Sequence, residues 1–275
     1  MEKPSVTQRK RLKIRARRLL TRRVLPFVAA LFLATPMATP VSKSLAHATD
    51  VQTRQPSAKA VQSAFFTQQM QELYRELNLE QQGLQYDVFA KAMTGYLNLE
   101  KEGKLGDKKL LTVIDFDLPS TEKRLWVLDL AAKQVVFHTL VAHGHNSGEN
   151  MATTFSNENE SNMSSLGFYV TQSEYTGKHG RSLKLQGVDE GYNTNALARS
   201  VVMHGADYVS EAFIQQYGRL GRSLGCPALP MDQYEQIIDS VGNGTCLFLN
   251  GNDSSYSSKY LDQDIAMNTL LASNG

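Results

Sequence analysis

The residues best suited to chemistry in this 275-residue chain are Cys226 and the turn that surrounds it. In Ser223-Leu224-Gly225-Cys226-Pro227 the glycine allows a sharp turn or a close approach, and the proline fixes the exit of the chain. Such a turn can present an exposed sulfur next to backbone N–H groups, which a nucleophile and its oxyanion require. Arg222 adds positive charge beside it.

A cysteine nucleophile needs a base, because a free thiol with a pKa near 8.5 is mostly protonated at neutral pH. His204 is the best candidate. It ends the apolar run Val201-Val202-Met203 and is followed by Gly205, so a rigid strand would hold it at the edge of a loop. A single histidine at such a position is also compatible with a purely structural role.

Cys246 lies in the apolar segment Thr245-Cys246-Leu247-Phe248 and is expected to be a small buried hydrophobic residue. With Cys226 it makes an even cysteine count, which in an oxidising compartment also fits a single disulfide. The sequence therefore leaves a structural pair open beside a catalytic thiol.

The other histidines and the tyrosines give weaker signals. A zinc set could be drawn from His143, His145, His204 and Cys226, but no Cys-x-x-Cys or His-Glu-x-x-His pattern supports it. No metal or cofactor is therefore expected. His143 and His145 are expected to line the cleft or a nearby loop, and His138 and His179 to be strand and loop residues. Tyr169, Tyr175 and Tyr192 either shape the cleft or pack in the core.

These residues must be held by a domain that we predict to be mainly β. Six segments between residues 110 and 250 are rich in β-branched and aromatic residues and are separated by turn signals: 110–116, 123–130, 134–144, 166–171, 199–205 and 245–250. Many short strands with few long helices favour a sandwich or a barrel over residues 106–250.

A helical segment precedes this domain. Apolar residues recur every three or four positions between residues 61 and 99, and Gly83 divides the run into two helices. The segment 61–105 is expected to be a packing cap on the main domain, with a separate binding module as the alternative. Residues 49–60 are interpreted as a linker, and residues 251–275 as a loose polar tail. The chain as a whole is α+β.

The first 48 residues have the features of an export signal. A basic stretch from Lys3 to Arg23 is followed by the apolar run 24–34 and by Ala46-His47-Ala48, a small-x-small cleavage pattern. The apolar run is too short to span a bilayer, which takes about 20 residues. An uncleaved anchor or a disordered basic tail is the alternative.

Charge supports the same interpretation. Residues 1–48 hold 11 of the 29 Lys and Arg residues but one of the 27 Asp and Glu residues. The rest of the chain is therefore acidic and would not be drawn to polyanions, which argues against a nucleic-acid site. We expect a periplasmic or otherwise extracytoplasmic protein with no stable membrane span once the signal is removed.

The motifs together resemble a known family. His204-Gly205, a connecting segment and Ser223-Leu224-Gly225-Cys226 are similar to the active-site motif of YkuD-type L,D-transpeptidases. Leu140 to Gly144 and Ser164 to Val170 resemble two further segments of that family, in the right order. The resemblance covers about residues 110–250 and is nearest to the divergent branch of murein L,D-transpeptidase catalytic domains.

The resemblance implies a YkuD-like fold and a cysteine acyl transfer on peptidoglycan stem peptides. Cys226 would attack the amide before a D-alanine, and His204 would carry the proton. Gly205 would orient His204 through its carbonyl, Ser223 would assist, and the N–H groups of Cys226 and Gly225 would bind the oxyanion. Arg222, His143 and Tyr169 are the expected substrate contacts.

The chain departs from the family pattern at two positions. Leu224 stands where the motif usually has histidine, and Pro227 begins a segment without the usual arginine. Arg222 either takes over the binding of a substrate carboxylate or is a solvated loop charge. Two alternatives to transpeptidation stay open: an L,D-carboxypeptidase that uses water as the acceptor, and a non-catalytic wall-binding protein with a Cys226–Cys246 disulfide.

Overall fold

The structure is a computed structural model that describes residues 57–178 and 180–273. The predicted export segment 1–48, most of the predicted linker and His179 lie outside the described residues. Within them, no helix is both long and apolar enough to cross a membrane.

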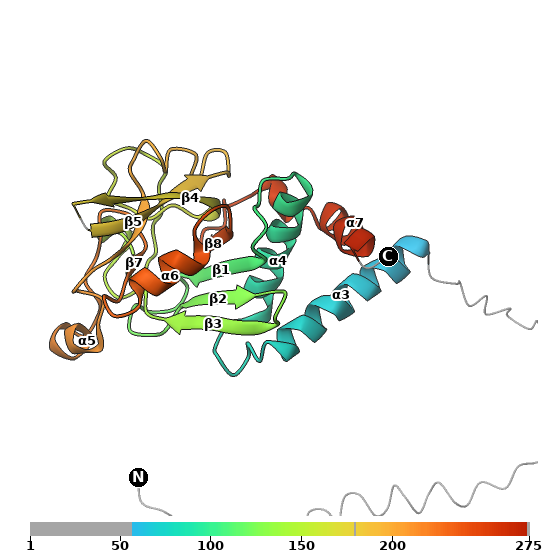
Figure 1. The fold of residues 1–275 in the computed structure, drawn as a ribbon, viewed down its shortest axis with the longest axis horizontal. Helices are drawn as coiled ribbons and strands as arrows, with labels where there is room; N and C mark the ends of the chain where they lie inside the picture. Colours follow the sequence, from blue (N-terminus) through green and yellow to red (C-terminus); the bar gives the residue numbers. More distant parts are fainter. Residues whose placement is uncertain (1–56, 179, 274–275) are drawn as a thin grey trace, which may run out of the picture. The chain divides into compact units, whose positions relative to one another are not determined.

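One curled, mixed sheet forms the centre of this part of the chain (Figure 1). Its strand order is β3-β2-β1-β8-β4-β5-β6-β7. The strands are β1 (Leu110–Asp115), β2 (Leu125–Asp129), β3 (Gln134–Thr139), β4 (Gly167–Gly177), β5 (Gly180–Gly187), β6 (Val202–Gly205), β7 (Ala228–Leu229) and β8 (Cys246–Asn250).

Two pairs in this sheet are parallel, β1 with β8 and β6 with β7, and the other five are antiparallel. β8 comes last in the sequence, yet it lies between β1 and β4. It therefore joins an N-terminal half, β1 to β3, to a second half, β4 to β7.

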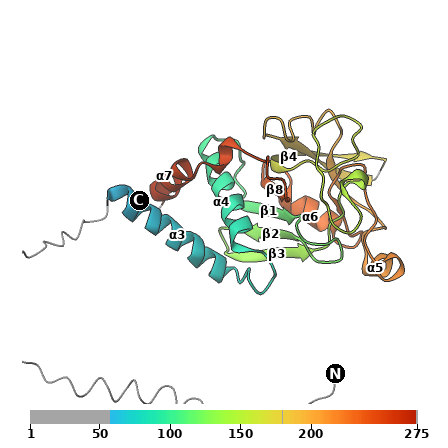
Figure 2. The same ribbon diagram turned by 180° about the vertical axis from the view of Figure 1, so that it is seen from behind.

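Five α-helices surround the sheet in the described residues: α3 (Ala58–Glu76), α4 (Tyr86–Lys101), α5 (Glu211–Tyr217), α6 (Tyr234–Val241) and α7 (Gln263–Ser273). α3 begins after Ser57, whose side chain caps it by accepting from the Ala60 N–H at 3.2 Å. Figures 1 and 2 show α3 and α7 side by side, with α4 between them and the sheet.

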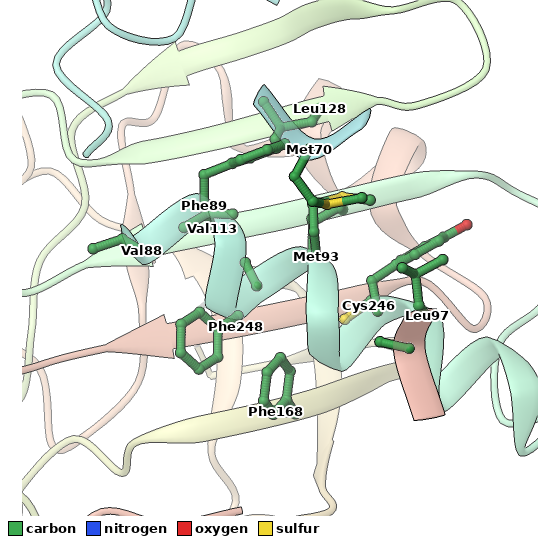
Figure 3. Packing of buried hydrophobic residues seen from close by; sticks show 14 of the residues in the cluster. Met70, Val88, Phe89, Met93, Leu97, Val113, Leu128, Phe168, Cys246 and Phe248 are labelled. Carbon is green, nitrogen blue, oxygen red and sulfur yellow. The ribbon is translucent and has the colours of Figure 1, made fainter. Parts of the chain in front are cut away.

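α4 packs its buried side on the sheet across β1, β8 and the first half of β4. Val113, Phe168, Cys246 and Phe248 belong to one cluster with the α4 residues (Figure 3). Gly95 allows the close contact, because a Cβ at that position would lie 2.0 Å from the Phe168 ring. The approach of α4 to the sheet therefore depends on a missing side chain.

The opposite face of the sheet has its own core. Along β8, Leu247 and Leu249 alternate with Cys246 and Phe248 and pack in a second cluster together with α6. The amphipathic α6 contributes Tyr234, Ile237, Ile238 and Val241 to this cluster. The sheet is thus covered by α4 on part of one face and by α6 on the other.

The predicted architecture, a mainly β domain preceded by two helices, is confirmed. Gly83 lies in the turn between α3 and α4, as expected. β5, β7 and the three later helices were not predicted. The segment 251–275 differs from the expected loose tail: α7 forms there, and Asn98 of α4 donates hydrogen bonds to Tyr260 O at 2.7 Å and Asp262 O at 2.9 Å.

Candidate active site

The Cys226 turn is held by its own side chains and by the loop before it. Ser223 Oγ accepts from Gly225 N–H at 3.0 Å and donates to Cys226 O at 2.6 Å, which closes the turn. The Ser223 backbone exchanges hydrogen bonds with His143 O at 3.0 Å and His145 N–H at 2.7 Å. The position of the sulfur is therefore set by a turn pinned at both ends.

Gly225 is required in this turn for two reasons. Its φ is +120°, which other residues rarely adopt, and a Cβ would lie 2.8 Å from Met163 O. Leu224, one of the two departures from the family pattern, is 73% exposed. The turn therefore places an apolar side chain in solvent beside a partly exposed thiol.

The sulfur lies against the segment that leads into β6. Val202 N–H donates to Cys226 Sγ at 3.4 Å, and the thiol donates to Ser200 O at 3.7 Å. Ser200 has φ +56°, a left-handed conformation uncommon for serine, which aims its carbonyl at the turn. One backbone acceptor and one donor thus bracket the thiol, so both its protonated and its ionised form have a partner.

His204 is two residues further along β6. It is paired with Ser182 of β5 on one side and with Ala228 of β7 on the other, and it is almost fully buried. His204 Nδ1 donates to Gly205 O at 2.9 Å, so in the neutral ring Nε2 carries the lone pair. The β6–β7 register brings Cys226, two residues before Ala228, alongside the same strand.

Arg199 is a residue of this site that the sequence did not reveal. Its guanidinium donates to Met163 O at 2.7 Å, Ser156 O at 2.8 Å and Ser161 Oγ at 3.0 Å. A Cβ on Gly225 would lie 3.2 Å from Arg199 Nη2, so the guanidinium packs against the Cys226 turn. No pattern around Arg199 marks it locally, because its partners come from a loop about forty positions earlier.

The surroundings of Cys226 have opposing effects on the pKa of its thiol. Burial raises the pKa of the Cys226 thiol, whereas the Val202 N–H and the Arg199 guanidinium act to lower it; the net pKa is raised. The resting site therefore holds a thiol rather than a thiolate.

Arg222 is bound by its own chain. Arg222 Nη1 donates to Glu149 Oε1 at 2.8 Å, to Gly148 O at 3.0 Å and to His145 O at 3.2 Å, and its side chain is 12% exposed. These contacts hold the loop 145–149 beside the turn. They differ from the solvated loop charge that was one of the two expectations, and the role in binding a substrate carboxylate stays a prediction.

His143 does not line the cleft, contrary to expectation. It is fully buried, and its Nδ1 accepts from Arg124 Nη2 at 2.7 Å while Nε2 donates to Gly148 O at 3.3 Å. Burial, and next the Arg124 charge, lower the pKa of His143 to about 4. The buried guanidinium of Arg124 thus uses the neutral His143 ring as a hydrogen-bond acceptor. His143 is a neutral structural residue.

Tyr169 is likewise buried and differs from the expected substrate contact. It lies on the α6 face of β4, and its hydroxyl donates to Ser165 O at 2.9 Å. Of the other aromatic candidates, Tyr175 is partly exposed beside β6, and His138 stacks on Trp126. His145 is exposed in the loop that Arg222 holds.

Both cysteines are free thiols, which contradicts the alternative of a Cys226–Cys246 disulfide. Cys246 is fully buried under α4 (Figure 3), and Cys226 lies in the turn before β7. Across the described ranges, no group of three His, Cys, Asp or Glu residues is arranged to hold a metal ion.

The fold and the site define an α+β domain with a turn-held cysteine beside a strand-end histidine. Residues 80–250, more than half of the chain, match the profile of the YkuD_2 family, described as an L,D-transpeptidase catalytic domain. The chain belongs to this family. The resemblance found in the sequence is thereby confirmed.

Similar solved structures include an L,D-transpeptidase from Mycobacterium smegmatis, at 13% identity and TM-score 0.34, with 52% of this chain and 59% of that chain covered. L,D-transpeptidase 3 from Mycobacterium tuberculosis, with a faropenem-derived adduct, has 12% identity and TM-score 0.33, covering 52% and 61%. The helical cell shape determining protein Pgp2 from Campylobacter jejuni has 13% identity and TM-score 0.37, covering 65% and 63%.

The chain thus spans about three fifths of the length of these structures. The superpositions are weak, so the family assignment rests on the profile match. Comparison with curated protein sequences gave no match.

Proposed function

We propose that this chain is an exported cysteine acyltransferase, an L,D-transpeptidase that acts on peptidoglycan stem peptides. Cys226 is the nucleophile and His204 the base. The observation that carries the proposal is the contact of Cys226 Sγ with Val202 N–H at 3.4 Å, at the start of β6, the strand that contains His204. Membership of the L,D-transpeptidase catalytic domain family supports the general reaction.

Activation of the thiol has to occur during the attack, because burial raises the pKa of Cys226 and keeps it protonated. Gly205 O accepts the Nδ1 proton of His204, so Nε2 is the nitrogen that receives the thiol proton. The Val202 N–H then stabilises the developing charge on sulfur. The mechanism is therefore general-base catalysis by His204, and not the use of a preformed thiolate–imidazolium ion pair.

The chemistry has two balanced steps. In the first, a bond forms between Cys226 Sγ and the carbonyl carbon of the third stem residue, and the amide bond to D-alanine breaks. His204 gives the proton to the leaving amine. In the second, an amine of another stem peptide attacks the thioester, loses a proton to His204 and releases Cys226 as a thiol.

The oxyanion of each step is assigned to the Cys226 N–H. Gly225 N–H, the other expected donor, already donates to Ser223 Oγ at 3.0 Å. Ser223 therefore acts by positioning, since it holds the turn that aims both the sulfur and the Cys226 N–H. Gly225 contributes its backbone conformation.

The test is to incubate the full chain with tetrapeptide muropeptides and to determine the products by mass. Cys226→Ala is expected to lower turnover by about 10³-fold or more, because the covalent route is lost. Cys246→Ala is the matched control and should keep its activity, since that thiol is buried under α4. Equal products from wild type and Cys226→Ala would refute the proposal.

The same reaction distinguishes the acceptor. A cross-linked product requires an amine acceptor, whereas a shortened tripeptide with no cross-link, formed even when amine is in excess, shows the L,D-carboxypeptidase reaction.

Export is tested by sequencing the N-terminus of the protein recovered outside the cytoplasm. It should begin at Thr49, after the Ala46-His47-Ala48 motif.

A further inference from the structure

A hollow of about 380 Å³ is lined in part by the two residues whose backbones contact the Cys226 sulfur. Its walls are Tyr175, Lys184, Leu197, Ser200, Val201 and Val202. Two of these residues contact the sulfur through their backbones, Ser200 O at 3.7 Å and Val202 N at 3.4 Å. A peptide bound to the sulfur therefore has this hollow next to its reacting group.

The strand register places the hollow on the same sheet face as His204. Ser182 is directly opposite His204 on one side and Tyr175 on the other, and Lys184 is directly opposite Val202. Opposed residues of antiparallel strands project to the same face, with Cβ atoms about 5 Å apart. Tyr175, Lys184 and His204 therefore face the same space, and Lys184 is level with the residue that touches the sulfur.

Lys184 gives this hollow a positive charge that no carboxylate of the described chain neutralises. The side chain is exposed, and Nζ lies 5.5 Å from the centre of the Tyr175 ring. No ion pair of Lys184 is found within residues 57–178 and 180–273, whereas Arg181 of the same strand pairs with both Glu174 and Asp239. The charge is thus held over an aromatic ring rather than against an acid.

We infer that Lys184, with Tyr175, is the subsite for a carboxylate of the donor peptide within one residue of the scissile amide. The inference rests on the proposed function. A residue spans about 3.5 Å of extended chain, and a lysine opposite the residue that contacts the sulfur is therefore placed for groups close to the reacting carbonyl. The terminal carboxylate of the leaving D-alanine is such a group. A side-chain carboxylate on the third stem residue is the other source of the same chemistry.

The experiment measures kcat and KM of the full chain on four synthetic tetrapeptide donors. The D-alanine terminus and the third-residue side chain each occur as carboxylate and as amide. Lys184→Met is compared with Lys184→Arg, and Lys91→Met on the exposed side of α4 is the matched control. Labelling of Cys226 by iodoacetamide reports in each variant whether the site is still assembled.

On the dicarboxylate donor, Lys184→Met should lower kcat/KM by about tenfold, mainly through KM, and Lys184→Arg should recover most of the loss. The penalty should disappear when the D-alanine terminus is an amide. If it disappears only with the side-chain amide, the same subsite binds the third residue. Either result supports a carboxylate subsite.

An equal loss of kcat/KM in Lys184→Met on all four donors, or no loss, would overturn the proposal of a carboxylate subsite. A wild-type chain that processes no donor, although Cys226 is labelled normally, would instead refute the proposed function. The two failures are therefore separate observations.

Discussion

Cys246 lies in β8 near the middle of the sheet, Cys226 lies in the turn before the edge strand β7, and the surroundings of the two thiols are opposite. Around Cys246, α4 covers the sheet, and the side chains that face the helix are apolar, such as Val113 and Phe248. Beyond α4 the same face continues over β5 and β6, where Ser182, Lys184 and His204 project. A helix over one half thus produces a core, and its absence over the other half leaves room for polar chemistry.

The register supports this view of one continuous face. Val170, which packs in the α4 cluster, is opposite Gln186 of β5, and Lys184 follows two residues along on the same side. An irregularity in β4 between Thr171 and Glu174 then brings Tyr175 to this face. One inserted residue therefore sends an aromatic ring to the open half instead of to the α6 core.

The largest expected effect is the difference in reactivity between the two thiols. In native protein at pH 9, iodoacetamide should modify Cys226 on the order of 10³-fold faster than Cys246, which must wait for local unfolding. Mass analysis of tryptic peptides over time measures both rates. Comparable rates in the folded protein would contradict the conclusion that the two thiols have different surroundings. In urea the two rates should converge.

Two glycine substitutions separate the halves by function. Gly95→Ala places a methyl 2.0 Å from the Phe168 ring and should lower the free energy of unfolding by about 2–3 kcal/mol. Activity per folded molecule should be unchanged. Gly225→Ala forces a side chain onto a φ of +120° and should lower turnover by about 10²-fold, with a smaller loss of stability.

Urea denaturation measures the free energy of unfolding of both variants, and a muropeptide assay measures their turnover per folded molecule. Each variant is the control for the other. A Gly225→Ala chain that loses only stability, or a Gly95→Ala chain that loses turnover per folded molecule, would show that the halves are not separable in this way.

The smallest effect concerns the charge beside the thiol. Arg199 lowers the pKa of Cys226 against the effect of burial, so Arg199→Met should raise that pKa further. At a fixed pH below the pKa the thiolate fraction falls, so the iodoacetamide rate should fall and the midpoint of that rate against pH should move to higher pH.

Arg199→Lys keeps the charge and should keep the midpoint near that of wild type. Arg219→Met is the control, because Arg219 pairs with Glu149 and does not act on the Cys226 pKa. A midpoint that stays in place in Arg199→Met would mean that the guanidinium only supports the loop.

The sequence was enough to predict the strands and turns whose residue types mark them locally. The β-branched and aromatic residues and the turn signals around them marked β1 and β8, and the Gly225-Cys226-Pro227 turn and the strand before His204 were visible in the sequence. The hydrogen bond from His204 Nδ1 to Gly205 O matches the expected contact, and its role in catalysis stays a prediction.

What the sequence hid depends on contacts between distant segments. β5 contains Arg181 and Lys184 and becomes a strand through its pairing with β4 and β6. His143 looked like a cleft residue because nothing nearby shows that Arg124 is fully buried against it. The charge of Arg199 next to the turn is hidden for the same reason.

The place of β8 has a consequence for the order in which the protein can acquire its tertiary structure. The strand that joins the two halves of the sheet is the last one synthesised, and it pairs with β1, about 135 residues earlier in the chain. Such a contact forms slowly, because closing the long loop costs conformational entropy before any strand hydrogen bond can offset that cost. Until residues 246–250 insert, β4 has no partner on that side, and the strands around Cys226 cannot be fixed to the rest of the sheet. A partly made chain is therefore expected to lack catalytic activity, because Cys226 and His204 acquire their relative positions only at the end.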